Sequence, residues 1–137
     1  MTDHQSQDAG EFRSQWIAAV EAFDQGEFFE CHDLLEEIWS ESLGPEREFY
    51  QGLIHAAVCL HHFRESNLQG ARKMYLSAVK YLSPYAPTCR GLRVDLFLKD
   101  LKHCFHELMA ASGPYPSEIE LQVEKLPRLA PLLGESL

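Results

Sequence analysis

Two side chains of the sequence, His32 and Glu36, have types and a spacing that suit proton transfer or metal binding. They lie four residues apart, so a helix places them on one face, one turn from each other. At about 100° per residue they fall inside the apolar arc of that helix, between Trp39 and Phe29. A buried carboxylate is costly unless it is paired. We therefore expect Glu36 to be buried and to pair with His32.

A second set of polar side chains lies along the next apolar stretch of the chain. Its members are spaced i, i+3, i+7 and i+14, within about 60° of one another on a helix: Glu48, Gln51, His55 and His62. A Gly-Pro turn at 44–45 makes the two helices antiparallel neighbours. The stripe could then face the first pair. The sequence thus predicts one polar cluster between the two helices, formed by His32, Glu36, Gln51, His55 and His62.

Two interpretations of this cluster remain open. It could be a hydrogen-bond network that fixes the register of the helices. It could instead be a pocket for a small molecule or a metal, since imidazole and carboxylate suit zinc, iron or manganese. The paired Glu-x-x-His motifs of di-iron bundles are absent from the sequence. Cys31 and Cys59 lie mid-helix among apolar residues, which disfavours a thiolate nucleophile. The sequence therefore assigns no catalytic residue, metal or cofactor.

The elements that must position these residues are predicted to be helices. Apolar spacing favours an all-α fold, a compact bundle of five to six helices built as stacked antiparallel helical hairpins. Asp24 and Glu27 read as a capping box for the second helix, and Asn67 as the cap of the fourth. No segment alternates with period two, so we expect no sheet. The predicted helices cover 11–23, 28–43, 46–65, 68–82 and 96–111, with a short sixth after Ser117.

The chain of 137 residues is long enough to bury a core without disulfides or metals. We expect a disordered tail at 1–9 and a single all-helical domain at 10–137. From Leu126 onward the sequence predicts an irregular apolar segment that packs on the bundle. A weak echo at an offset of 40 residues supports two similar hairpins side by side.

The net charge of −9 argues against binding to duplex nucleic acid. The charge is split along the chain: residues 1–48 carry 13 acids and two bases, and residues 64–103 carry eight bases and three acids. One strip of acids is predicted on the solvent side of the second helix: Glu30, Asp33, Glu37 and Glu41. The bases are spread over two later helices, so we expect a homodimer that pairs acid with base and weakens as salt rises.

Four cysteines occur without a C-x-x-C pair, which indicates free thiols in a reducing compartment. The first residues are polar and acidic and do not resemble a secretory signal. The longest uncharged run, 49–63, contains three histidines and is predicted to be a buried helix instead of a membrane span. We expect a cytoplasmic protein that does not bind membranes.

Three blocks of sequence resemble a known family of small all-helical proteins, domain of unknown function family 309. They cover roughly residues 12–100 and read Phe23-x-x-Gly26-x-Phe28-Phe29-x-x-His32-Asp33-x-Leu35-Glu36-x-x-Trp39, then Phe49-x-Gln51-Gly52-Leu53-Ile54, then His62-x-x-x-x-Asn67-x-x-Gly70-Ala71. The resemblance implies a compact helical bundle without an assigned reaction. His55 departs from the family pattern, whereas Trp39, Asn67 and Gly70 match it.

The sequence favours a non-catalytic module that binds another protein or itself. Stacked hairpins and a charge split are typical of such modules, and the sequence contains no complete set of catalytic residues. The protein partner cannot be named from the sequence. The alternative is a protein that binds a small molecule or a metal through the His/Glu cluster between the second and third helices. This alternative includes a hydrolytic enzyme.

Overall fold

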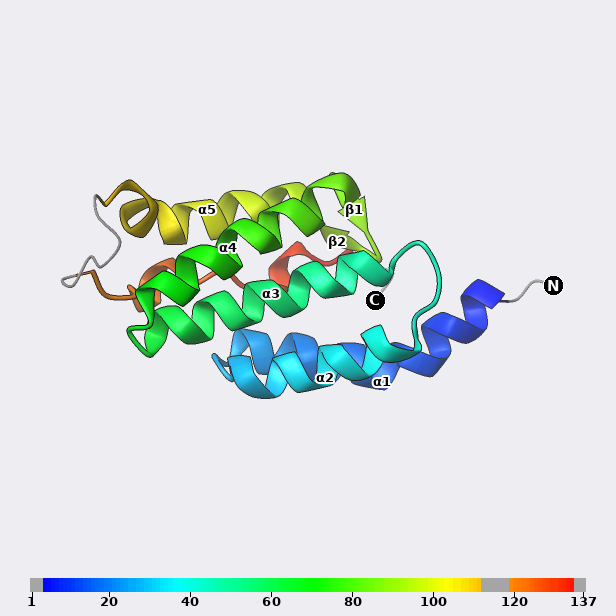
Figure 1. The fold of residues 1–137 in the computed structure, drawn as a ribbon. Coiled ribbons are helices and arrows are strands. Elements are labelled where there is room, and N and C mark those ends of the chain that lie inside the picture. The colour runs from blue at the N-terminus through cyan, green and yellow to red at the C-terminus, as the bar shows by residue number, and fades with distance from the viewer. Residues whose placement is uncertain (1–3, 112–118, 135–137) are drawn as a thin grey trace.

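The computed structural model describes residues 4–111 and 119–134, and the expected all-α fold is confirmed. Successive helices lie side by side as antiparallel hairpins (Figure 1). Within the described ranges the helices are α1 His4–Asp24, α2 Phe28–Glu41, α3 Arg47–Arg64, α4 Leu68–Leu82 and α5 Val94–Ala110. Three short 3-10 turns accompany them: η1 Ser83–Tyr85, η2 Val123–Lys125 and η3 Ala130–Leu132.

Most helix ends agree with the local signals in the sequence. Asn67 caps α4 as predicted, because its Oδ1 accepts the N–H of Gly70 at 3.1 Å. The first helix begins at His4, inside the stretch 1–9 that was expected to be disordered, and continues through Gly10. Of the predicted sixth helix, residues 112–118 lie outside the described part, and the chain from 119 to 122 is not helical.

One small sheet corrects the prediction that none would form. Strand β1 (Thr88–Cys89) pairs antiparallel with β2 (Leu92–Arg93), with Thr88 opposite Arg93 and Cys89 opposite Leu92. The connecting residues Arg90 and Gly91 both have positive φ, 52° and 81°, as a tight two-residue hairpin turn requires. Strands of two residues are too short to show alternation, so the sequence pattern could not reveal them.

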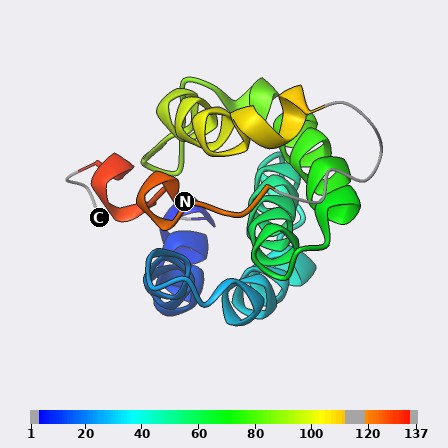
Figure 2. The ribbon, with the colours of Figure 1, turned by 90° about the vertical axis from the view of Figure 1, so that its left-hand side faces the viewer.

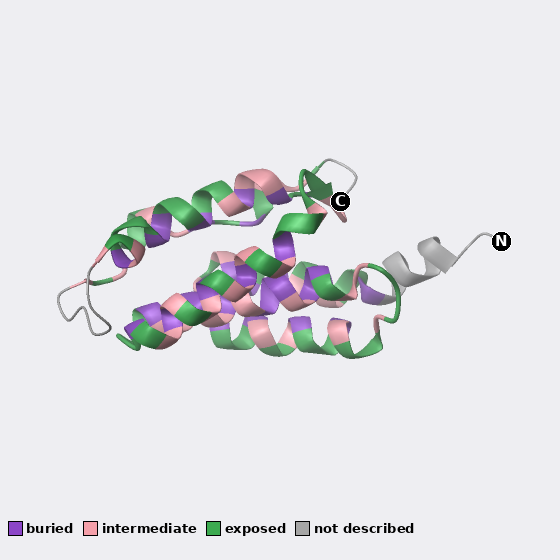
Figure 3. Cartoon of the chain, turned by 45° about the horizontal axis from the view of Figure 1, so that its top comes forward, coloured by how far each residue is buried: buried purple, intermediate pink, exposed green. Residues whose placement is uncertain are grey.

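The core runs through the whole stack and is centred on α3. In Figure 3 the residues coloured as buried lie along the helices where these face one another. The largest side chains that are fully buried include Phe23, Phe28, Phe49, Phe97 and Phe105. At one point α3 and α4 approach so closely that a Cβ on Gly52 would lie 2.6 Å from Cγ of Leu82. The side chain of Leu82 therefore packs directly on the backbone of α3, which requires glycine at position 52.

The C-terminal segment 119–134 lies between the first and last helices of the stack. In Figure 2 the helices follow one another around an arc, and this segment runs between α1 and α5. Leu129 is 1% exposed, and Leu133 forms an antiparallel bridge with Leu92 of β2. The prediction that an apolar tail packs on the bundle is confirmed.

Asp24 holds this segment and does not cap α2 as predicted. Its two carboxylate oxygens accept the N–H groups of Leu129 at 2.6 Å and Ala130 at 3.0 Å. Arg128 lies 3.8 Å from the same carboxylate. The N-cap position of α2 is Glu27, whose side chain makes no capping hydrogen bond. The Asp24 carboxylate thus binds the backbone of the C-terminal segment instead of forming the predicted capping box at the start of α2.

Candidate functional site

The predicted polar cluster is divided between two interfaces of α3. Gln51 and His55 face α4, where His55 Nδ1 lies 2.6 Å from Oγ of Ser77 and its Nε2 lies 2.7 Å from Nε2 of Gln51. The ring also meets Tyr81 edge-on, with 5.2 Å between ring centroids. The prediction that these side chains converge on His32 is wrong, because the stripe along α3 is rotated toward α4 and away from α2.

The hydrogen bonds of His55 determine what it can do chemically. With the amide nitrogen of Gln51 donating to Nε2, the ring proton is on Nδ1 and is donated to Ser77. Burial lowers the pKa of His55 below its ordinary value, which keeps the ring neutral. Both ring nitrogens are engaged, and His55 cannot take the proton of Ser77 in this arrangement. The interface is suited to fixing the register of α3 and α4.

His32 and Glu36 form the predicted pair at the surface of α2. Nε2 of His32 lies 3.1 Å from Oε2 of Glu36, and Nδ1 lies 3.3 Å from Oδ1 of Asp33. The side chain of His32 is 21% exposed, whereas that of Glu36 is 54% exposed. The expectation that Glu36 is buried is therefore wrong. Helix α2 packs mainly against α1 and α3, and the edge of its apolar arc at Phe29 remains open to solvent.

The imidazole of His32 belongs to a surface patch that spans α2 and α3. The ring of Phe29, which is 62% exposed, stacks on His32 with 5.6 Å between centroids and an interplanar angle of 26°. On its other side Phe29 lies 5.8 Å from His61, and His61 lies 6.1 Å from His62. We call Phe29, His32, His61 and His62 the imidazole patch.

Sequence reasoning missed His61. Ile54, Val58 and His61 are spaced i, i+4 and i+7, which is the signal for the face of α3 that meets α2. Nδ1 of His32 and Nδ1 of His61 are inaccessible to solvent and make no hydrogen bond. The His61 ring packs against Phe29, and the His32 ring packs against Phe29 and pairs with Glu36 through Nε2.

The remaining positions that match the family pattern have local structural contacts. Trp39 stacks under the guanidinium of Arg47, 3.8 Å from its ring centroid, at the turn between α2 and α3. A Cβ on Gly70 would lie 2.7 Å from Nδ2 of Asn67, so glycine is needed beside the cap. Asn67 Nδ2 also approaches Nδ1 of His62 at 3.2 Å, and burial lowers the pKa of His62.

The thiols are not set up as nucleophiles. Cys31, Cys59 and Cys104 are buried, and Cys89 is half-buried. Burial raises the pKa of Cys31 and of Cys104 to about 12 and that of Cys89 to about 11. A thiol with so high a pKa is almost wholly protonated at neutral pH, and the thiolate is the reactive form.

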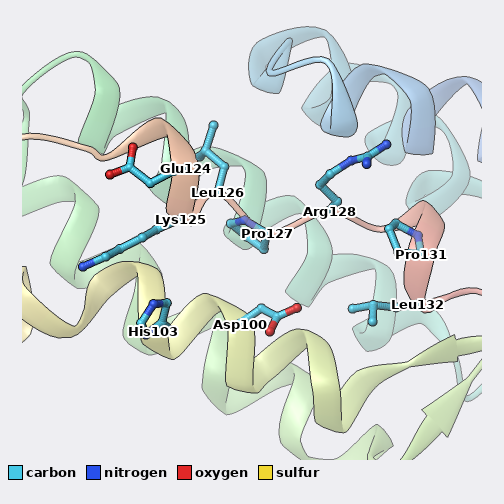
Figure 4. A pocket seen from close by; sticks show the side chains of 9 residues that line it. All are labelled: Asp100, His103, Glu124, Lys125, Leu126, Pro127, Arg128, Pro131 and Leu132. Atoms are coloured by element: carbon cyan, nitrogen blue, oxygen red, sulfur yellow. The ribbon is translucent and has the colours of Figure 1, made fainter.

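A cavity of about 260 Å³ lies away from the imidazole patch, between α5 and the C-terminal segment. In Figure 4 Asp100 and His103 come from α5 and the other side chains from the segment opposite. Asp100 and His103 are exposed, and prolines form much of the other wall. Its lining residues are Asp100, His103, Glu124, Lys125, Leu126, Pro127, Arg128, Pro131 and Leu132.

Comparison with known proteins finds a family model that matches part of the chain. Residues 16–74 match the model of a family described as "Domain of unknown function (DUF309)". The resemblance is confirmed. "Uncharacterized protein YpuF" of Bacillus subtilis (strain 168) is 31% identical over 110 residues, 78% of this chain and 63% of that protein. An "Uncharacterized protein" of Aquifex aeolicus (strain VF5) is 32% identical over 74 residues, 53% of this chain and 22% of that protein.

The chain therefore spans less than two thirds of the length of either relative. No solved structure gives a significant match to the chain. The DUF309 match contains the whole imidazole patch, whereas Ser77 and Leu129 lie beyond it. No helix in the described residues is long and apolar enough to cross a membrane.

Proposed function

We propose that this protein is a non-catalytic binding module that docks on another protein surface through the imidazole patch. The observation that carries the proposal is Phe29, an aromatic side chain that stays 62% exposed although it stacks on His32. Aromatic residues that are exposed within a polar rim are enriched at protein interfaces. The four free thiols suit a reducing compartment, and we propose that the protein binds its partner in the cytoplasm.

The stacking of Phe29 supports a role in binding. His32 and His61 fix the ring from both sides, so little side-chain freedom is left to lose when a partner covers it. A pre-organised aromatic of this kind has the features of an interface hot spot. Burying the ring on a partner would also remove its apolar surface from water.

The rim of the patch indicates the chemistry of the partner. Asp33 and Glu36 lie on the same side of α2 as Phe29. Glu30 and Glu37 lie farther around the helix, and all four acids are exposed. A surface with lysine or arginine side chains around an apolar centre would complement this rim. We therefore propose a basic protein surface as the partner.

Site-specific photo-crosslinking in the cell that encodes the protein tests this proposal. The full chain carries benzoylphenylalanine in place of Phe29, and a matched chain carries it in place of Leu43, which is 89% exposed and outside the patch. We expect discrete protein adducts from position 29 and none of comparable yield from position 43. Equal labelling at both positions, or none at position 29, would refute the proposal.

A metal ion is the second candidate ligand. Ligand atoms of His32, Asp33 and Glu36 all lie within 4.8 Å of one another, and these donor types suit zinc or manganese. The two carboxylates lie at different ring nitrogens of one imidazole, so a single ion would have to draw one carboxylate away from its present partner. Thermal shift with Zn²⁺ or Mn²⁺, in the native chain and in His32→Ala, tests this candidate. A metal-induced rise of Tm that the variant loses supports it, and an equal response of both chains rejects it.

A further inference from the structure

The solvent face of α4 has the composition that would complement the imidazole patch. Leu76 is 57% exposed, and Lys73 and Lys80 lie three residues before it and four residues after it. These spacings place the three side chains within about 60° on one face of the helix. The face therefore has an exposed apolar centre with a lysine on each side.

The solvent face of α2 combines an exposed apolar side chain with charges of the opposite sign. Phe29 is the apolar side chain, and Asp33 and Glu36 follow at four and seven residues on the same side of the helix. Both faces thus present one large exposed apolar side chain beside two charges of a single sign. Complementary potentials of this kind promote association and fix its orientation.

The acidic face of α2 and the basic face of α4 cannot contact each other within one chain. Helix α3 lies between α2 and α4 (Figure 1). Ion pairs of the described residues include those of Arg90 with Glu46, Arg93 with Asp95 and Arg128 with Asp24. Lys73 and Lys80 take part in none of these pairs and are exposed. The basic face is available to a second molecule.

We infer that the α2 face of one copy of this chain docks on the α4 face of a second copy, an inference that rests on the proposed function. Helices α2 and α4 run in the same direction, antiparallel to α3 (Figure 1). A two-fold axis parallel to α3 therefore brings α2 of each copy against α4 of the other, with the two helices parallel. Phe29 and Leu76 meet across both contacts, and Asp33, four residues after Phe29, lies opposite Lys80, four residues after Leu76. The assembly closes as a dimer.

Sedimentation equilibrium of the full chain over roughly a hundredfold range of concentration tests this inference. We expect a dimer whose Kd rises as salt increases from about 0.05 to about 0.5 M, because exposed charge pairs are screened. Asp33→Lys or Lys80→Glu places like charges at both contacts and should raise the Kd at least roughly tenfold. Far-ultraviolet circular dichroism verifies that each variant keeps its helices.

The decisive part of the experiment tests whether mixing two charge-reversed variants restores the affinity of the dimer. An equimolar mixture of Asp33→Lys and Lys80→Glu chains regains opposite charges at both contacts, and we expect it to associate as tightly as the native chain. Lys99→Glu and Glu107→Lys, which reverse exposed charges on α5, are matched controls and should leave the Kd unchanged.

Two outcomes would overturn the inference. The first is a native chain that stays monomeric at low salt, and the second is a dimer that the reversals on α2 and α4 leave unaltered. The mass of the photo-crosslinked adduct separates this failure from failure of the proposed function. Adducts from position 29 that contain a different protein would retain the docking function and exclude the second copy, whereas the absence of adducts at position 29 would reject both.

Discussion

The carboxylate of Asp24 accepts the backbone N–H of Leu129 at 2.6 Å, a hydrogen bond between residues 105 positions apart. The side chain of Asp24 is 8% exposed, and it also accepts the N–H of Ala130. Through this contact the end of α1 anchors the C-terminal segment against the stack. The segment therefore depends on one buried acceptor as well as on its apolar side chains.

Replacement of Asp24 by alanine should lower the free energy of unfolding by about 1–3 kcal/mol, because two backbone N–H groups lose their acceptor. Urea denaturation of both chains measures the difference. Glu27→Ala is the control, since that side chain is exposed and makes no capping bond, and it should change stability by less than about 0.5 kcal/mol. Equal stability of Asp24→Ala and the native chain would mean that the segment is held by apolar contact alone.

The stability of the protein should fall as pH decreases from about 7 to about 5, with His55 as one cause. Burial lowers the pKa of His55 in the folded state. Below about 6.5 the unfolded chain takes up a proton at this residue while the folded chain resists it, so acid favours unfolding. In His55→Gln the dependence of stability on pH should be shallower. His106→Gln, at an exposed site on α5, should retain the native slope, and a native slope in His55→Gln would contradict this account.

Loss of the Glu36 carboxylate should have a small effect on stability. Its side chain is 54% exposed, and exposed pairs contribute about 0–1 kcal/mol. We expect a double-mutant cycle of His32→Ala and Glu36→Ala to give a coupling energy below about 1 kcal/mol. A coupling of several kcal/mol would show that the pair is buried in solution and that the original sequence prediction was correct.

The four thiols should differ in their reactivity in the native state. Cys89 is half-buried and its pKa is raised to about 11, whereas Cys31, Cys59 and Cys104 are buried. We expect Cys89 to react first with a thiol reagent and the other three to react slowly. The unfolded chain, in which all four should react alike, is the control. Rapid labelling of Cys31 or Cys59 in native protein would contradict the packing of α2 and α3.

Much of the fold could be predicted from local signals in the sequence. Helix α4 has the predicted bounds, Leu68–Leu82, because Asn67 is an effective cap at its start and a Ser-Pro pair follows its end. The approach of α3 to α4 at Gly52 has no comparable signal, since it depends on the neighbouring Leu82. Local chemistry therefore predicts where helices begin and end better than it predicts how they meet.

The candidate site was harder to predict for the same reason. The spacing of Gln51, His55 and His62 correctly predicts a polar stripe along α3, but spacing within one helix does not say which neighbour the stripe faces. His61 lies on the face that meets α2 and was overlooked among apolar neighbours. The role of Asp24 was also hidden, because its partners lie at the other end of the chain.

The yield of photo-crosslinked adduct at position 29, with and without Asp33→Lys in the same chain, tests the central claim most directly. If an acidic rim around an exposed aromatic ring recruits a basic surface, charge reversal beside the ring should lower the yield at least roughly tenfold. The same reversal at Glu107, on exposed α5, should leave the yield unchanged. An adduct of undiminished yield in the Asp33→Lys chain would contradict the claim that this face selects its partner by charge.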